Sequence, residues 1–384
     1  MKKNLFMTAA AIAALLTGCS TDEEIANIET SAKNAIGFNI VSNSAETKAK
    51  IYGNGSTNFD FDVFAFNSTT GDLFMGTHQP DFGHDGVDIY YNTTDQKWDY
   101  RNPDKLAYWP TNDLDFYAVS PATFDNNLLG FLQWLIHFNE QKIIYSTVDE
   151  FSTGTKNLDV MYAVAKQQRK NANGGVVSLN FKHTLSQVLF RAKVQYEFME
   201  VTIKKMMITN FYTGGTFTFP TDDNAPTQRN WSSTDKQHTG SGGFTVKKAG
   251  TDITASSTTE AQWITVENDP MLFIPQTLTA WKTTPESAVT KADGDSQNNS
   301  YLIIDMKLTQ NKQYLIGSET EYKTIYVPFG AEWQPGKRYI YTLNFGGGYD
   351  EHGKPMLTPI TFEASVENWK DTSENTQDVP AYTN

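Results

Sequence analysis

Cysteine is almost absent from this sequence, since Cys19 is the only one among 384 residues. A single thiol excludes an intramolecular disulfide framework and any motif that needs paired cysteines. Positive charge is also scarce, with 31 Lys and Arg against 44 Asp and Glu and a formal net charge of -13. Because an acidic chain repels phosphate backbones and no basic stripe laced with aromatics is present, we expect no nucleic-acid partner.

Long apolar runs are missing except at the N-terminus. Two lysines precede a mostly apolar stretch from Leu5 to Leu16, which is the pattern of a secretory signal peptide and is too short to span a bilayer. It ends in Leu16-Thr17-Gly18-Cys19, which resembles the lipobox of bacterial lipoproteins. We predict a signal peptide over residues 1–18, cleavage between Gly18 and Cys19, and lipid on Cys19 that attaches the protein to a membrane.

A polar segment, residues 19–35, follows the signal peptide and is predicted to be a tether. It begins with the acidic run Ser20-Thr21-Asp22-Glu23-Glu24, which resembles the surface-export signal of lipoproteins in Gram-negative anaerobes. A plain solvated tether is the alternative interpretation. We favour export, and therefore expect a lipoprotein exposed at the cell outer membrane.

Motifs that carry catalysis are lacking. No Gly-x-Ser-x-Gly elbow occurs, and lipidation of Cys19 leaves no thiol for nucleophilic work. The segment from Gly348 to Lys354 has the glycine and lysine spacing of a phosphate-binding loop, but Pro355 stands where Ser or Thr is needed and strand-like segments lie on both sides. We predict a hairpin loop there. The chain is not expected to be an enzyme or to hold a cofactor, although dispersed glycosidase carboxylates would leave no local signature.

Several histidines and acidic residues are of the types that ligate metals. Five of them crowd a turn-rich loop without a fixed ligand spacing, so we predict no metal site there: His78, Asp81, His84, Asp85 and Asp88. His137 and Glu140 form one pair without a second ligand-bearing motif. Asp60 and Asp62 share one face of a predicted strand, as on any half-solvated strand. His183 follows an apolar strand and is expected to be a hydrogen-bonded core histidine.

The composition favours an all-β fold. Aromatic residues make up 13% of the chain and helical periodicity is rare, so we expect short strands that form sandwiches or barrels. The segment Phe59–Phe66 alternates like a half-buried strand and then becomes wholly apolar. One helix is predicted over Leu128–Ile136. Further strands are predicted at Ile36–Val41, Val87–Tyr91, Leu114–Val119, Leu158–Ala165, Val176–Phe181, Val188–Val194, Val201–Tyr212, Phe244–Lys247, Met271–Ile274, Tyr301–Leu308, Tyr322–Val327, Arg338–Phe345 and Ile360–Val366.

Length predicts two domains, because about 365 mature residues exceed what one hydrophobic core usually serves. The polar stretch of residues 166–175 ends in paired glycines and is either a hairpin loop or a domain linker. We place the boundary there, with an N-terminal domain over residues 36–174 and a C-terminal domain over residues 175–384.

Six phrases in the mature chain resemble the fimbrillin family. They are Tyr108-Trp109-Pro110 followed by Leu114 to Pro121, then Asp159 to Ala163, Leu179 to Val188, Met271 to Gln276, and Trp333 to Leu343. Each is moderately specific, and their order together with the lipobox carries the resemblance. It implies two transthyretin-like β-sandwich domains and a structural or adhesive role in type V pili, the fimbriae of Gram-negative anaerobes.

The resemblance also implies how such a subunit is assembled. A trypsin-like protease removes the first strand, and a strand from another pilin subunit fills the exposed groove. Here the removable strand is Ile36–Val41 and the candidate processing sites are Lys48 and Lys50. The tail after Trp369 is polar, so we expect any donated strand to be Ile360–Trp369, or else a tip or accessory position for this subunit.

The second hypothesis is a surface glycan-binding lipoprotein of a polysaccharide-capture system. In that case some of the eight tryptophans would form platforms for sugars of a host or bacterial surface ligand. Core packing is the alternative use of tryptophan, and we expect it for at least five of the eight because aromatic area dominates sandwich cores.

Overall fold

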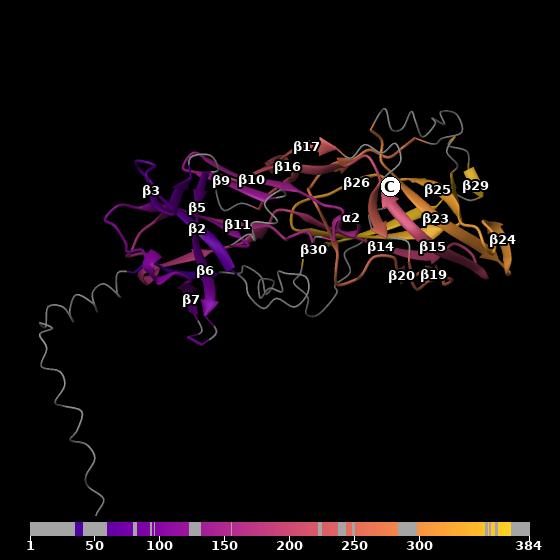
Figure 1. The fold of residues 1–384 in the computed structure, drawn as a ribbon, viewed down its shortest axis with the longest axis horizontal. Coiled ribbons are helices and arrows are strands. Elements are labelled where there is room, and N and C mark those ends of the chain that lie inside the picture. The colour runs from indigo at the N-terminus through magenta and orange to yellow at the C-terminus, as the bar shows by residue number, and fades with distance from the viewer. Residues whose placement is uncertain are drawn as a thin grey trace, which may run out of the picture.

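A computed structural model shows an elongated, almost entirely β-stranded molecule (Figure 1). It describes residues 35–40, 60–79, 83–92, 94–95, 97–122, 132–154, 156–221, 225–236, 243–247, 250–282, 298–349, 352, 355–357 and 360–369. The helices in these ranges are single turns, such as α2 (Glu150–Thr153) and η1 (Pro103–Lys105). The predicted all-β class is confirmed. No helix of the described ranges is long and apolar enough to cross a membrane.

The N-terminal half is built around one central sheet with the strand order β13-β11-β8-β2-β6-β7. Its strands are β2 (Asp60–Asn67), β6 (Val87–Asn92), β7 (Lys97–Tyr100), β8 (Leu114–Ser120), β11 (Met161–Gln168) and β13 (Lys182–His183), and β3 (Leu73–Met75) pairs with β2. Both faces of the sheet are covered. Phe61 and Phe116 face one core cluster, whereas Phe64 and Tyr117 face another. Burial on both faces explains why the predicted alternation in β2 gives way to a continuous apolar run.

Two smaller sheets cover these faces. The first consists of β1 (Gly37–Ile40) and β12 (Val176–Leu179). The second has the order β17-β16-β10-β9, with β9 (Leu132–His137), β10 (Glu140–Ser146), β16 (Tyr212–Thr218) and β17 (Trp231–Lys236). This second sheet joins strands from before and after residue 175. The division into domains at that point stays a prediction, and the β10–β16 ladder is a contact that crosses it.

The predicted helix over residues 128–136 is wrong for the part that the structure describes. Residues 132–137 form β9, which pairs with β10 in the register Leu132↔Tyr145 to His137↔Glu140. Residues 128–131 lie outside the described ranges. A short apolar run does not by itself distinguish a helix from a buried strand, and here the long ladder to β10 stabilises the strand.

The C-terminal half encloses its core between two sheets, ordered β20-β14-β27-β30 and β18-β15-β23-β25-β28-β29. The first has β14 (Ser186–Val194), β20 (Gln262–Trp263), β27 (Lys337–Phe345) and β30 (Thr361–Asn368), with β21 (Met271–Phe273) on β14. The second has β15 (Met199–Ile208), β18 (Phe244–Lys247), β23 (Tyr301–Gln310), β25 (Lys323–Pro328), β28 (Gly347–Tyr349) and β29 (Pro355–Leu357), with β19 (Ile253–Ala255) on β15 and β24 (Gln313–Ile316) on β23. The ladder between β14 and β27 is parallel.

The single strand predicted over Val201–Tyr212 is two strands, β15 and β16. The break falls at Asn210, whose positive φ of 55° is a backbone conformation that asparagine adopts more readily than most residues. The side-chain amide of Asn210 donates a 2.8 Å hydrogen bond to the carbonyl of Asn299, which holds the turn. The chain therefore leaves one sheet at this residue and enters another.

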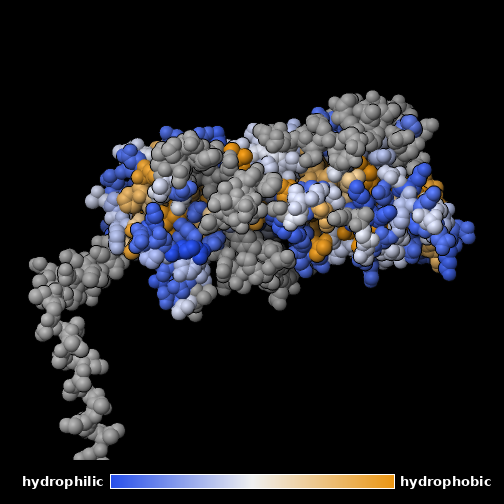
Figure 2. All heavy atoms as spheres, viewed as in Figure 1, coloured by the Kyte–Doolittle hydropathy of each residue, from blue (hydrophilic) through white to orange (hydrophobic). Residues whose placement is uncertain are grey.

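Most other strand predictions are confirmed to within a few residues, and so is the hairpin at the sequence that resembles a phosphate loop. There β28 and β29 pair with Gly347 opposite Leu357 and Tyr349 opposite Pro355. The surface in Figure 2 is mostly blue and white, with orange in separate patches. Among the coloured residues of this face, few apolar side chains are thus exposed, and most of the apolar residues lie in the three core clusters.

Candidate functional site

The first described strand, β1, is held by backbone bonds on both sides. It lies parallel to β12, with Gly37 opposite Val176 and Ile40 opposite Leu179. On its other side the amide of Ile36 donates a 2.9 Å hydrogen bond to the carbonyl of Ala107, and Ala35 forms an isolated bridge with Tyr108. The strand thus fills a slot between β12 and the segment of residues 107–108.

Alternate side chains of β1 point into the N-terminal core. Ile36 is 1% exposed and Phe38 is 6% exposed, whereas Asn39 between Phe38 and Ile40 is exposed. Burying two large apolar side chains of this kind contributes roughly 3 to 6 kcal/mol in total. The alternation predicted for residues 36–41 is confirmed over the residues that the structure describes.

Aromatic rings form the floor of the slot. The ring of Phe38 lies 6.2 Å from Phe61, 5.9 Å from Tyr100 and 6.1 Å from Phe116, measured between centroids. The Tyr100 hydroxyl donates a 3.0 Å hydrogen bond to the carbonyl of Ile36, and burial raises the pKa of that hydroxyl. Without β1, these three rings would face solvent and the carbonyl partner of Tyr100 would be lost.

The rim of the slot is formed by Trp109, Gly175 and several exposed apolar side chains. The indole Nε1–H of Trp109 donates a 2.9 Å hydrogen bond to the carbonyl of Gly175. This bond connects the segment after η1 to the start of β12. Gly175 has a φ of 85°, where a larger residue would be strained and would crowd the Trp109 ring. Leu106, Tyr108 and Val176 are exposed around the opening. These three side chains give the slot a partly apolar rim.

The site residues that the sequence predicts are not among the described residues of the β1 slot. Gly18 and Cys19, predicted as the signal cleavage and lipidation site, and Lys48 and Lys50, predicted as processing sites, lie outside the described residues. The strand before the lysines, predicted over Ile36–Val41, is described and is β1. The sequence predicts its partner β12 as a strand but not as the parallel neighbour of β1, because pairing between distant strands leaves no local pattern.

Of the two acidic candidates on β2, Asp60 belongs to an ion-pair network and Asp62 lies beside other carboxylates. Asp60 is 2.9 Å from Arg101, which also pairs with Asp88 on the neighbouring strand β6. The pKa of Asp62 is raised well above its usual value by burial, and by the nearby charges of Asp88 and Asp60. In the described ranges, no group of three His, Cys, Asp or Glu residues is placed to hold a metal ion.

His183 is hydrogen-bonded, as predicted, and its half-buried ring lies at the edge of the core. Its Nδ1 lies 2.9 Å from an Asp159 carboxylate oxygen, and its ring stacks on Trp369 with centroids 4.1 Å apart and an interplanar angle of 7°. His137 and Glu140 face each other as backbone partners of β9 and β10. His78 and His84 do the same in the hairpin of β4 (Thr77–Gln79) and β5 (Gly83–Asp85).

The tryptophans mostly serve the cores. Trp231, Trp281, Trp333 and Trp369 are buried, and Trp98 and Trp109 pack against the N-terminal cluster. Trp263 is half-buried under the guanidinium of Arg191, 5.0 Å from the ring centroid. Trp134 lies where side chains are not described. This distribution agrees with the expectation of core packing and leaves few indole faces for sugars.

The chain is an all-β protein in which a short strand, β1, completes a hydrophobic core that later strands form. A model of the fimbrillin-like family matches residues 47–369. The chain therefore belongs to the fimbrillin-like family, a non-enzymatic class of fimbrial and cell-adhesion proteins of the cell surface.

Comparison with solved structures concerns the fold alone. A fimbrial protein from Bacteroides vulgatus is similar with a TM-score of 0.54 and 15% identity, over 88% of this chain and 100% of that chain. The tip fimbrial protein Mfa3 from Porphyromonas gingivalis, with a C-terminal truncation, has a TM-score of 0.38 and 8% identity over 81% of this chain and 94% of that chain. The first likeness shows a shared fold. Comparison with curated proteins gave no match.

Proposed function

We propose that this protein is a structural or adhesive subunit of type V pili that is exported as a lipoprotein and assembled by strand exchange at the β1 slot. Lipid on Cys19 anchors the precursor to the cell outer membrane. Proteolysis after Lys48 or Lys50 then removes β1 and the lipid together. A strand from another pilin subunit takes the place of β1.

The observation that carries this proposal is the way β1 is attached. It contributes two deeply buried side chains, Ile36 and Phe38, and its strand ladder is with β12 alone. Its loss would leave the β12 edge unpaired and an aromatic groove uncovered. An unpaired edge offers backbone donors and acceptors, and the groove beneath selects apolar side chains at alternate positions. The family match begins at residue 47, after β1.

The strand that fills the slot comes from another subunit. The segment predicted for donation, Ile360–Trp369, forms β30 at the edge of its own sheet, paired with β27 from Lys337↔Asn368 to Asn344↔Thr361. Ile360 is buried, and Phe362 packs against the C-terminal core. Donating this segment would open the core of the donor, so we propose that β30 stays in place and that this subunit acts as an acceptor.

Electron microscopy of cells labelled with an antibody to this protein tests the proposal. We expect label along filaments in the wild type, and label confined to the cell surface in a Lys48→Ala/Lys50→Ala double variant, because its β1 cannot be released. A Lys105→Ala/Lys323→Ala variant, which removes two exposed lysines elsewhere, controls for loss of charge. Equal filament labelling in all three strains would disprove processing at these lysines.

A further inference from the structure

The strand β30 forms the longest edge of the described sheets. It ends the order β20-β14-β27-β30, and its eight residues pair with β27 from Lys337↔Asn368 to Asn344↔Thr361 without a shift of register. The other edge strands in the described ranges have six residues or fewer, and β17, one of the two with six, has register shifts. Proteins usually protect such an edge with a bulge, a proline or a lysine, and β30 contains none of these.

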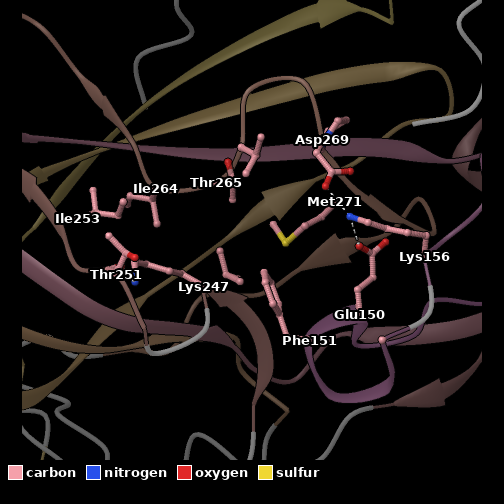
Figure 3. Close-up of a pocket in the computed structure, with 14 residues that line it drawn as sticks. Glu150, Phe151, Lys156, Lys247, Thr251, Ile253, Ile264, Thr265, Asp269 and Met271 are labelled. Carbon is pink, nitrogen blue, oxygen red and sulfur yellow. Dashed lines mark hydrogen bonds and ion pairs between the residues drawn. The ribbon is translucent and has the colours of Figure 1, made fainter. Parts of the chain in front are cut away.

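The opposite edge of the same sheet is covered. There β14 pairs with both β20 and β21. Beyond β21, Met271 and Phe151 of α2 line a cavity of about 420 Å³ (Figure 3). The charges at this cavity are paired within the chain, since Lys156 lies 2.8 Å from Glu150 and also pairs with Asp269. Among the described strands of this sheet, β30 therefore presents the one long open edge.

An apolar row lies along this edge. Phe362 and Ala364 pack against the C-terminal core, and Val366 lies on the same face because successive side chains of a strand alternate. All three are only partly buried, and Val366 is 38% exposed. The core is thus incompletely covered along β30, and a further strand at this edge would bury the apolar row.

The backbone groups that face the open edge follow from the pairing with β27. The amide of Trp369 donates a 3.0 Å hydrogen bond to the carbonyl of Gly336, and these two residues continue the β27–β30 register. Because residues of an antiparallel strand bond alternately to one side and to the other, the odd-numbered residues of β30 bond to β27. The N–H and C=O groups of Phe362, Ala364 and Val366 therefore point toward the open edge.

We propose that β30 pairs in antiparallel orientation with β30 of a second copy of this chain, about a two-fold axis at Ala364. In this register Phe362 lies opposite Val366 of the second copy, and Ala364 lies opposite its own counterpart. Each of these residue pairs can exchange two backbone hydrogen bonds, because all of them direct their N–H and C=O groups to the open edge. The apolar rows of the two copies become continuous, and the two sheets become one.

The charged side chains of β30 select this register. In it, Glu363 lies opposite Ser365 of the second copy and Thr361 lies opposite Glu367, so each carboxylate faces a hydroxyl that can donate to it. A shift by two residues in either direction would place two glutamates directly opposite each other, which is destabilising. Glu363 also lies 2.6 Å from Lys193 of its own sheet, which compensates its charge. Since β30 is complementary to itself in one register, a second copy is favoured over an unrelated strand as its partner.

This contact is separate from the β1 slot and needs no strand exchange. The strand β30 lies in the C-terminal half (Figure 1) and stays in its own sheet while it pairs. A two-fold contact uses the same surface on both copies and closes at a dimer. It can therefore be tested in a chain that retains β1. Failure of this contact would leave the strand-exchange proposal standing, and failure of processing at Lys48 and Lys50 would leave this contact standing.

Disulfide trapping at the two-fold axis tests the contact. A chain that begins at Ser20 contains no cysteine, because Cys19 is the sole one. In the Ala364→Cys variant the two introduced residues would lie opposite each other, with about 5.5 Å between their Cα atoms, a usual distance for a disulfide. We expect a cross-linked dimer under mild oxidation. Ser365→Cys is the matched control and should give several-fold less dimer, because its two copies would be diagonal neighbours about 7 to 8 Å apart, too far for a disulfide.

Charge at Ser365 gives the second measurement. Ser365→Glu would face Glu363 of the other copy, whereas Ser365→Lys would form an ion pair with it. Sedimentation of the chain from Ser20 is expected to show a dimer, with at least tenfold weaker association for Ser365→Glu and association at least as strong as that of the wild type for Ser365→Lys. A monomeric wild-type chain, equal weakening in both charge variants, or as much cross-linking in Ser365→Cys as in Ala364→Cys would overturn the proposal.

Discussion

A chain that begins at Ile51, and so lacks β1, is expected to unfold at a markedly lower urea concentration than the chain that begins at Ser20. It loses the burial of Ile36 and Phe38, worth roughly 3 to 6 kcal/mol, and exposes the rings of Phe61 and Phe116. The unfolding midpoint, followed by circular dichroism, measures this loss. We expect the shortened chain to remain folded, because the remaining core residues come from later strands.

A peptide of residues 35–41, added in excess, is expected to restore the midpoint of the shortened chain. Binding to the native state alone stabilises a protein in proportion to the logarithm of ligand concentration. The same peptide with Phe38→Asp is the matched control and should have no effect, since it would place a charge against Phe61 and Phe116. Equal midpoints for the long and short chains would show that β1 contributes nothing to the core, and the slot hypothesis would then fail.

Replacing Trp369 with alanine is expected to lower the free energy of unfolding by about 3 to 5 kcal/mol, the usual cost of removing a buried tryptophan. Trp369 is 5% exposed and stacks on His183, and its amide donates a 3.0 Å hydrogen bond to the carbonyl of Gly336. Urea unfolding of the chain from Ser20 measures the change. A loss of this size would mean that the end of β30 belongs to the stable monomer.

Trp263→Ala is the matched control for this experiment. Its ring is half-buried and carries one cation-π contact with Arg191, so its loss should cost about 1 kcal/mol. If Trp369→Ala costs no more than this control, the segment Ile360–Trp369 is held loosely. The monomer could then release it, which contradicts our view that β30 stays in place.

The sequence predicts this fold well where a pattern is local. Alternating residues in β1, the apolar runs of β2 and β8, and the turn before β29 all lie in short stretches whose spacing carries the information. The hydrogen-bonded histidine at residue 183 is predictable for the same reason, because it follows an apolar strand. The phrase containing Trp109 supports the resemblance, and the structure gives it a physical role, since Trp109 bonds to Gly175 at the rim of the slot.

Features that depend on distant partners could not be predicted in this way. Nothing near Val176 indicates that it lies parallel to Gly37, and nothing near Tyr212 indicates that β16 pairs with β10 of the other half. The helix prediction is wrong over residues 132–136 for the same reason, because only the ladder to β10 shows that this segment is a strand. Asn210 is a partial exception, since asparagine tolerates the left-handed conformation that divides β15 from β16.

Mass spectrometry of the protein from purified filaments and from the cell membrane tests whether β1 and the lipid are removed before assembly. We expect a membrane-bound form with lipid on Cys19 and residues 36–40 intact, and a filament form that begins at Ala49 or Ile51 without lipid. The peptide that carries Phe38 separates the two forms. Filaments whose subunits retain that peptide and the lipidated Cys19 would show that assembly does not require the removal of β1.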